Sequence, residues 1–150
     1  MLFKGAAAVS VSGESMWSAA KVLAVSTLAV VALSGCAAFG VSKDSDLETK
    51  QKVVTERAEA RWNALIKADL DEAYTYLSAG SKATTSLLVY KASIKPGRWR
   101  EAKVEKVECE AEVCRATVNI TFDDRRMKGI QMPLVESWII ENRSAWYVYR

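Results

Sequence analysis

Hydrophobic positions change their spacing once along this chain, near Pro96 and Gly97. Before that point, apolar side chains recur at three- and four-residue steps, at Leu47, Val54, Ala58, Trp62, Leu65 and Ile66. This period predicts one long amphipathic helix that ends at about Ala68. The pattern Ser45-x-x-Glu48 has the form of a capping box, so we expect Ser45 to cap the first turn of this helix.

Two shorter helices are predicted after the long one. Asp69 precedes the run DEAYTYL and repeats the capping pattern, which indicates a short helix up to Leu77. The residues SAGS at 78–81 are expected to break that helix. The run SKATTSLLVYKAS at 81–93 then predicts a third helix with Leu87, Leu88 and Tyr90 turned inward.

From Trp99 onward the hydrophobic period is two, which is typical of strands. Val104 and Val107 cannot share one face of an unbroken strand, and this predicts a bulge near Lys106. Two later strands each have one apolar face, formed by Ala116, Val118, Ile120 and Phe122 and by Met132, Leu134, Glu136, Trp138 and Ile140. A last strand is expected in AWYVYR at 145–150. Helices followed by a four-stranded antiparallel sheet predict an α+β fold.

The start of the chain has a different pattern, because about a dozen apolar or small residues follow Lys21 and end at the sequence LSGC. This length suits the apolar core of a signal peptide, and a membrane-spanning helix needs roughly 20 residues. We therefore expect residues 1–35 to be a signal peptide, with translation starting at Met16. The alternative is an uncleaved anchor with an incidental cysteine.

The sequence Leu33-Ser34-Gly35-Cys36 resembles the lipobox of bacterial lipoproteins. The resemblance implies cleavage after Gly35 and a mature N-terminus at Cys36 that carries diacylglycerol and palmitate. Because each buried methylene contributes about 0.8 kcal/mol, two or three acyl chains form a durable anchor. Ala37 follows the cysteine, which favours an outer-membrane lipoprotein that faces the periplasm over an inner-membrane one. Residues 36–46 have no hydrophobic period and are expected to be a lipidated tether.

The two remaining cysteines, Cys109 and Cys114, lie at the end of one predicted strand and the start of the next. An exported domain meets an oxidising compartment, so we expect a disulfide across this hairpin. The alternatives are a metal pair and a redox-active dithiol. Two ligands do not make a zinc site, and redox pairs favour the spacing CxxC.

Composition excludes several classes of function. The 150 residues contain no histidine, which removes Ser-His and Cys-His nucleophile pairs and histidine zinc sites. The sequence contains no Walker loop, dinucleotide glycine pattern, HExxH motif or EF-hand loop, so no cofactor or metal is expected. A net charge of +3 is too small to indicate nucleic-acid binding.

The run ERAEARWNALIKADLDEAYTYLSAGSK at 56–82 and the closing WIIENRSAWYV at 138–148 resemble the NTF2-like (cystatin-like α+β) superfamily, and more narrowly its small bacterial lipoproteins. The matching positions are Arg61, Trp62, Ala64, Leu65, Asp69, Ala73, Tyr74, Tyr76 and Ser78. Proline often follows the serine in the family, and this chain has Ala79 there. The resemblance implies that residues 47–150 form a cone, with one long and two short helices packed on a curved four-stranded antiparallel sheet. It also implies an apolar cavity and frequent dimerisation through the sheet.

The implied cavity would be lined by Trp62, Tyr74, Trp99, Glu136 and Trp138. Glu136 has two interpretations: it is a buried carboxylate paired with Arg57 or Arg61, or it is the base of an isomerase- or hydratase-like enzyme with Tyr74 or Tyr76 as the donor. We favour the first. The sequence therefore predicts a non-catalytic envelope protein that binds a small apolar ligand or an envelope protein partner. The cluster RRMK at 125–128 is expected to be a solvated loop, with anionic lipid head groups as its alternative contact.

Overall fold

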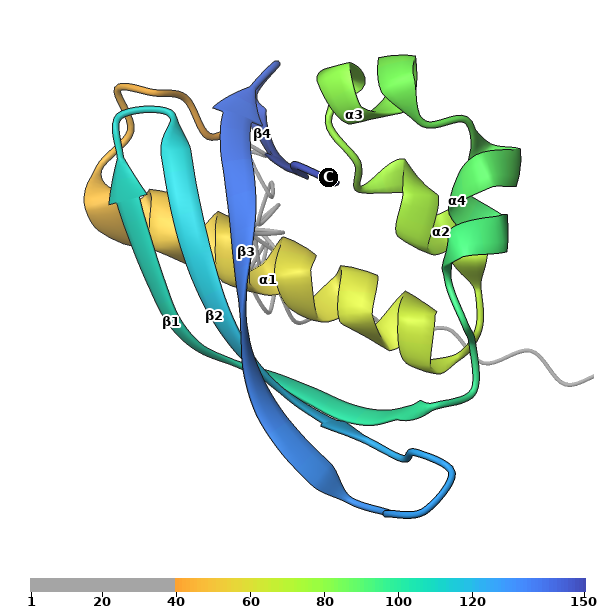
Figure 1. Cartoon of the computed structure of the whole chain (residues 1–150). Coiled ribbons are helices and arrows are strands. Elements are labelled where there is room, and N and C mark those ends of the chain that lie inside the picture. The colour runs from red at the N-terminus through yellow and green to blue at the C-terminus, as the bar shows by residue number, and fades with distance from the viewer. Residues whose placement is uncertain (1–39) are drawn as a thin grey trace, which may run out of the picture. The chain divides into compact units, whose positions relative to one another are not determined.

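The computed structural model describes residues 40–150, so the predicted signal peptide, Gly35 and Cys36 lie outside the described residues. The described part has helices followed by a curved antiparallel sheet, which confirms the predicted α+β class (Figure 1). The helices are α1 (Leu47–Ile66), α2 (Leu70–Thr75), α3 (Ala79–Thr84) and α4 (Leu87–Ser93). The strands are β1 (Trp99–Glu110), β2 (Val113–Phe122), β3 (Ile130–Glu141) and β4 (Ser144–Tyr147), paired in chain order.

Helix α1 has its N-cap one residue later than the capping-box pattern predicts. The Asp46 carboxylate accepts hydrogen bonds from the Thr49 backbone N–H and the Thr49 hydroxyl, both at 2.7 Å. Ser45 turns away, and its Oγ accepts a hydrogen bond from the Ser42 N–H at 2.9 Å. The prediction of Ser45 as the cap is wrong, because the two oxygens of Asp46 satisfy both donors of Thr49 at once.

The segment predicted as one third helix forms two helices, α3 and α4. Ser78 caps α3 and Ser86 caps α4, each by accepting a hydrogen bond from the backbone N–H three residues later. Residues 78–81 therefore begin a helix, where we had predicted a break. The extended backbone at Thr85 separates the two helices and reorients the second. As a result Leu88 is 79% exposed, contrary to the prediction, and Tyr90 is fully buried as predicted.

The sheet buries one face, as the period of two predicts. Val118, Ile120, Trp138 and Ile140 pack in the core with residues of α1. The register of β1 against β2 shifts between Val104 and Lys106, which confirms the predicted bulge, and again between Trp99 and Glu101. Figure 1 shows that β1, β2 and β3 continue past α1 at the lower end, where the β2–β3 loop lies. This end of the concave face therefore lacks a covering helix.

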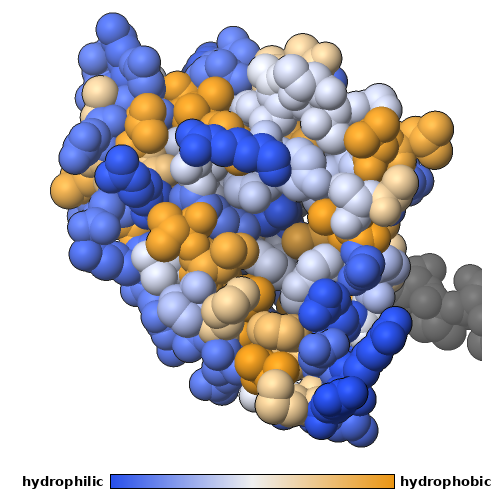
Figure 2. Space-filling model, in the orientation of Figure 1, coloured by the Kyte–Doolittle hydropathy of each residue, from blue (hydrophilic) through white to orange (hydrophobic). Residues whose placement is uncertain are grey.

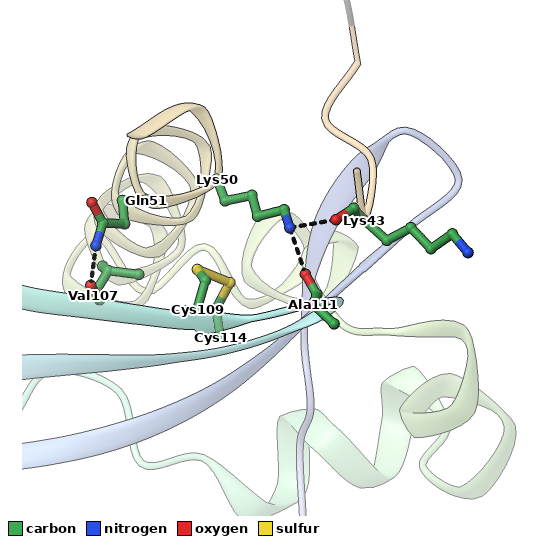
Figure 3. The surroundings of a disulfide bond; sticks show 7 residues. All are labelled: Lys43, Lys50, Gln51, Val107, Cys109, Ala111 and Cys114. Carbon is green, nitrogen blue, oxygen red and sulfur yellow. Dashed lines mark hydrogen bonds between the residues drawn. A yellow bond between two sulfur atoms is a disulfide. The ribbon is translucent and has the colours of Figure 1, made fainter. Parts of the chain in front are cut away.

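The stretch predicted as a tether is partly built into the domain. Val41 is 2% exposed and belongs to the core. The Lys50 ammonium donates hydrogen bonds to the backbone carbonyls of Lys43 and, at 2.8 Å, of Ala111 in the β1–β2 turn (Figure 3). The core of the described domain thus includes Val41, six residues before the predicted start at 47. A single apolar residue in a polar stretch has no period, so the pattern could not reveal it.

Cys109 and Cys114 lie directly opposite each other on β1 and β2, and a disulfide joins them (Figure 3). Cys114 is fully buried. The first turns of α1 lie over this hairpin, where the Gln51 amide donates a hydrogen bond to the Val107 carbonyl at 2.9 Å. The covalent link therefore stands at the point where the helix layer meets the sheet.

Candidate functional site

A charged pair lies at the centre of the domain. Strand β3 turns Glu136 inward, and the residue is 2% exposed. Its Oε1 accepts hydrogen bonds from Arg61 Nη1 at 2.6 Å and from Trp62 Nε1 at 2.9 Å, both on α1. Its Oε2 accepts a hydrogen bond from Trp138 Nε1 at 3.2 Å. Both carboxylate oxygens are therefore occupied by side chains of the protein.

Aromatic rings enclose the Arg61 guanidinium. Its Cζ lies 3.7 Å from the centroid of the Tyr147 ring and 5.5 Å from that of Trp62. Burial alone would lower the pKa of Arg61. The attraction of Glu136, with smaller contributions from Tyr147 and Tyr90, outweighs this effect, so the pKa of Arg61 is raised above its ordinary value. Burial raises the pKa of both tyrosines against the opposing effect of Arg61. The arginine is therefore charged and the phenols are neutral at physiological pH.

Four of the five predicted cavity residues come together around this pair. Trp62, Glu136 and Trp138 share hydrogen bonds, and Trp99 packs edge-on against Trp62 with ring centroids 5.9 Å apart. Tyr74 lies elsewhere, because its hydroxyl donates a hydrogen bond to a backbone carbonyl at the end of α3. Hydrogen-bonded and stacked side chains therefore surround Glu136, which is 2% exposed.

Neither tyrosine that we considered as a catalytic donor meets Glu136. The Tyr74 hydroxyl is bonded to the Thr85 carbonyl at 2.9 Å, and the Tyr76 hydroxyl donates to Glu72 Oε1 at 2.9 Å. The hypothesis that Tyr74 or Tyr76 acts as the donor beside Glu136 is therefore wrong, because both hydroxyls donate elsewhere. The donors that Glu136 has are an arginine and two indoles.

An apolar hollow lies at the end of the sheet that α1 leaves uncovered, and its lining residues are Arg98, Trp99, Ile120, Phe122 and Met132. The Arg98 guanidinium lies 5.3 Å from the centroid of the Phe122 ring. Figure 2 shows apolar atoms in orange at this lower end with hydrophilic atoms in blue beside them. The hollow offers apolar walls and one cation, which suits an apolar group attached to an anion.

Two cations and an aromatic ring come together at the edge of the sheet, at a place that the sequence does not indicate. Arg57, which we considered as a partner of Glu136, instead places its Cζ 4.6 Å from the centroid of the Trp146 ring. The Lys82 ammonium lies 5.5 Å from the same ring. Burial lowers the pKa of Arg57, and burial together with Arg57 lowers that of Lys82. No sequence pattern links these residues, because three separate elements bring them together.

Comparison of the chain with protein-family models and with curated proteins found no match. Between residues 40 and 150, no group of three or more Cys, Asp or Glu side chains is arranged to hold a metal ion. None of the helices described for this chain is long and apolar enough to cross a bilayer. The fold and the site define an α+β domain with an ion pair sealed in its core and an apolar hollow at its open end.

Proposed function

We propose that this chain is a lipid-anchored protein of the bacterial envelope, facing the periplasm, whose NTF2-like domain binds an apolar ligand without catalysis. The LSGC sequence at Cys36 supports the anchor. The observation that carries the binding role is the apolar hollow at the uncovered end of the concave sheet. Its chemistry favours an amphiphile with an acyl chain and a negatively charged head.

The surroundings of Glu136 count against an enzyme. A general base needs a free oxygen within hydrogen-bond reach of the substrate proton. Glu136 accepts three hydrogen bonds, and only 2% of the residue is exposed. A substrate would have to displace Trp138 or Arg61 from the core before it reached the carboxylate. The pair therefore serves as a structural centre.

The hollow supplies the binding energy through apolar contact. Each 100 Å² of ligand surface removed from water contributes roughly 2.5 kcal/mol. Arg98 stands at the rim, where its guanidinium remains available for a carboxylate or phosphate. A single-chain anionic amphiphile satisfies both features at once.

Binding is tested with a fluorescent long-chain fatty acid and the mature protein purified from bacterial envelopes in mild detergent. Met132→Glu places a charge on the wall of the hollow, since Met132 is 43% exposed there. Val135→Glu is the matched control, because Val135 is 62% exposed and its side chain points to the opposite face of β3. We expect Met132→Glu to weaken the affinity at least tenfold and Val135→Glu to leave it unchanged. If Met132→Glu binds the fatty acid as tightly as Val135→Glu does, the hollow is not the binding site.

The anchor and the partner need their own measurements. We expect labelled palmitate to be incorporated into the wild-type chain and not into Cys36→Ser, with Cys36→Ser lost from the outer-membrane fraction. The predicted homodimer through the sheet would form on the outer face, where Val135 lies, so Val135→Glu should convert a dimer to a monomer in sedimentation. An envelope protein that co-purifies with wild-type and Met132→Glu protein alike would favour a protein partner over the amphiphile.

A further inference from the structure

The positive charge of the domain is concentrated at one end. The chain from Cys36 onward has 19 basic and 17 acidic residues, since Lys4, Lys21 and Glu14 precede it. We define the hairpin cluster as the basic residues Arg98, Arg100, Arg125, Arg126 and Lys128 with the acidic residues Asp123 and Asp124. Outside this cluster, 14 basic residues face 15 acidic ones. The entire excess of positive charge therefore belongs to the β2–β3 loop and the start of β1.

Hydrogen bonds and an ion pair of the β2–β3 loop involve one of its two acidic residues, Asp123. Asp123 Oδ2 accepts a hydrogen bond from Arg100 Nε at 2.8 Å and forms an ion pair with Arg100 Nη2 at 2.7 Å, and Oδ1 accepts a hydrogen bond from the Gly129 N–H at 3.0 Å. The Asp123 N–H donates to the Arg98 carbonyl at 2.8 Å. Within residues 40–150, the remaining basic side chains of the cluster make no ion pair: Arg98, Arg125, Arg126 and Lys128.

An apolar side chain projects from the middle of these cations. Met127 is 61% exposed, and its neighbours in sequence are Arg126 and Lys128. The apolar hollow with Met132 opens at the same end of the sheet. A single exposed apolar residue is ordinary on a protein surface, and what distinguishes Met127 is that basic residues flank it on both sides. A lipid surface accepts it below the head groups while the long basic side chains remain at the level of the phosphates.

We propose that the hairpin cluster docks the domain on a bilayer that contains anionic phospholipid, with Met127 inserted between the head groups. The cations match the charge of the phosphates, and Met127 and the hollow match the acyl region. The proposal deepens the proposed function and rests on it, because the lipid anchor at Cys36 supplies the nearby membrane.

The anchor also determines how a docked domain must lie. Gly40 lies against Arg143 of the β3–β4 turn, and the four residues from Cys36 to Gly40 span at most about 14 Å. The hairpin cluster is at the opposite end of β2, about 30 Å away for a strand of this length. The β3–β4 turn, beside which Gly40 lies, and the hairpin cluster are both close to one bilayer only if the strands run along the membrane surface. The hollow then receives its amphiphile directly from the lipid.

The test uses mature protein purified from envelopes and reconstituted into phosphatidylcholine vesicles with and without phosphatidylglycerol. Hydrogen–deuterium exchange is followed over residues 123–130. We compare wild type with R125E/R126E and with the matched control K103E/K106E, which makes the same charge change at two exposed positions of β1. Met127→Ser removes the apolar tip and keeps every charge. Thermal unfolding of each variant without lipid checks that the fold is retained.

We expect phosphatidylglycerol to slow exchange of the loop at least fivefold in wild type and in K103E/K106E, and high salt to reverse the effect. R125E/R126E should lose the protection entirely, and Met127→Ser should lose most of it. Equal exchange with and without phosphatidylglycerol, or full protection in R125E/R126E, would overturn the proposal. So would equal protection by soluble polyaspartate without vesicles, which would indicate an acidic protein as the partner. Incorporation of labelled palmitate reports the lipid anchor separately. If the protein incorporates no palmitate, its binding to the same vesicles is measured by sedimentation.

Discussion

Replacing Glu136 by glutamine tests the structural role of the buried pair. Glutamine has nearly the same shape, but it leaves the Arg61 guanidinium, 4% exposed, without a counter-charge. It also replaces one acceptor oxygen of Glu136 by an NH₂ donor, which opposes the donors from Arg61, Trp62 or Trp138. Removing one member of a buried pair destabilises a protein by about 3–5 kcal/mol. A domain of this size has roughly 5–15 kcal/mol of stability in total, so we expect a large loss.

The double variant R61M/E136Q separates the cost of an unpaired charge from the value of the pair. It removes both charges and keeps one amide oxygen, which can accept a hydrogen bond from the indole N–H of Trp62 or of Trp138. Buried pairs replaced as a unit are often neutral in stability or better. We therefore expect the double variant to be more stable than E136Q alone, by at least about 1 kcal/mol.

The free energy of unfolding is measured by urea denaturation for wild type, both single variants and the double variant. Lys106→Met is the control, because the Lys106–Glu108 pair has similar length, 2.7 Å, with both side chains more than 60% exposed. We expect Lys106→Met to change the free energy by less than about 0.5 kcal/mol. A loss below about 1 kcal/mol in E136Q, or single-variant losses that simply add in the double variant, would refute the structural role.

Three further predictions follow from the fold. Asp46→Ala should lower the melting temperature more than Ser45→Ala, and melting of both variants between pH 2 and 7 checks this. Hydrogen bonds from the Thr49 side chain and then from its backbone lower the pKa of Asp46 in the folded state. The stability that the cap contributes should therefore be present above the ordinary carboxyl pKa and be lost as the pH falls through the lower pKa of the folded protein. Replacing Cys109 and Cys114 by alanine should cost about 2 kcal/mol in urea unfolding, since the disulfide closes a short loop. Tyr74→Phe removes one hydrogen bond and should cost about 1 kcal/mol without changing fatty-acid affinity.

The sheet was predictable because only one of its faces is buried. With one buried face, a shift of one residue would turn the whole apolar row outward, so the alternation at Val118, Ile120 and Trp138 specifies the register. The bulge followed from the same logic. The helical half was less certain, because Ser78 and Ser86 look like ordinary polar positions until their hydroxyls are seen to cap separate helices. Capping depends on backbone direction, which a hydrophobic period does not report.

The site was predictable as an inward carboxylate but not as a particular pair. Arg57 and Arg61 are four residues apart and therefore lie on one face of α1. The placement of α1 along the sheet decides which of them meets Glu136, and only tertiary packing sets that placement. Arg57 lies one turn away and donates a hydrogen bond to the Ala145 carbonyl of β4. The hollow depends in the same way on where α1 ends over the curved sheet.

The buried pair and the open hollow are linked through one side chain. Trp62 donates its indole N–H to Glu136, and its ring meets the edge of Trp99, which forms a wall of the hollow. The carboxylate thus orients the indole, and the indole supports the wall. In the structure, the residue that most resembles a catalytic base in the sequence is thus linked to the apolar hollow through packing.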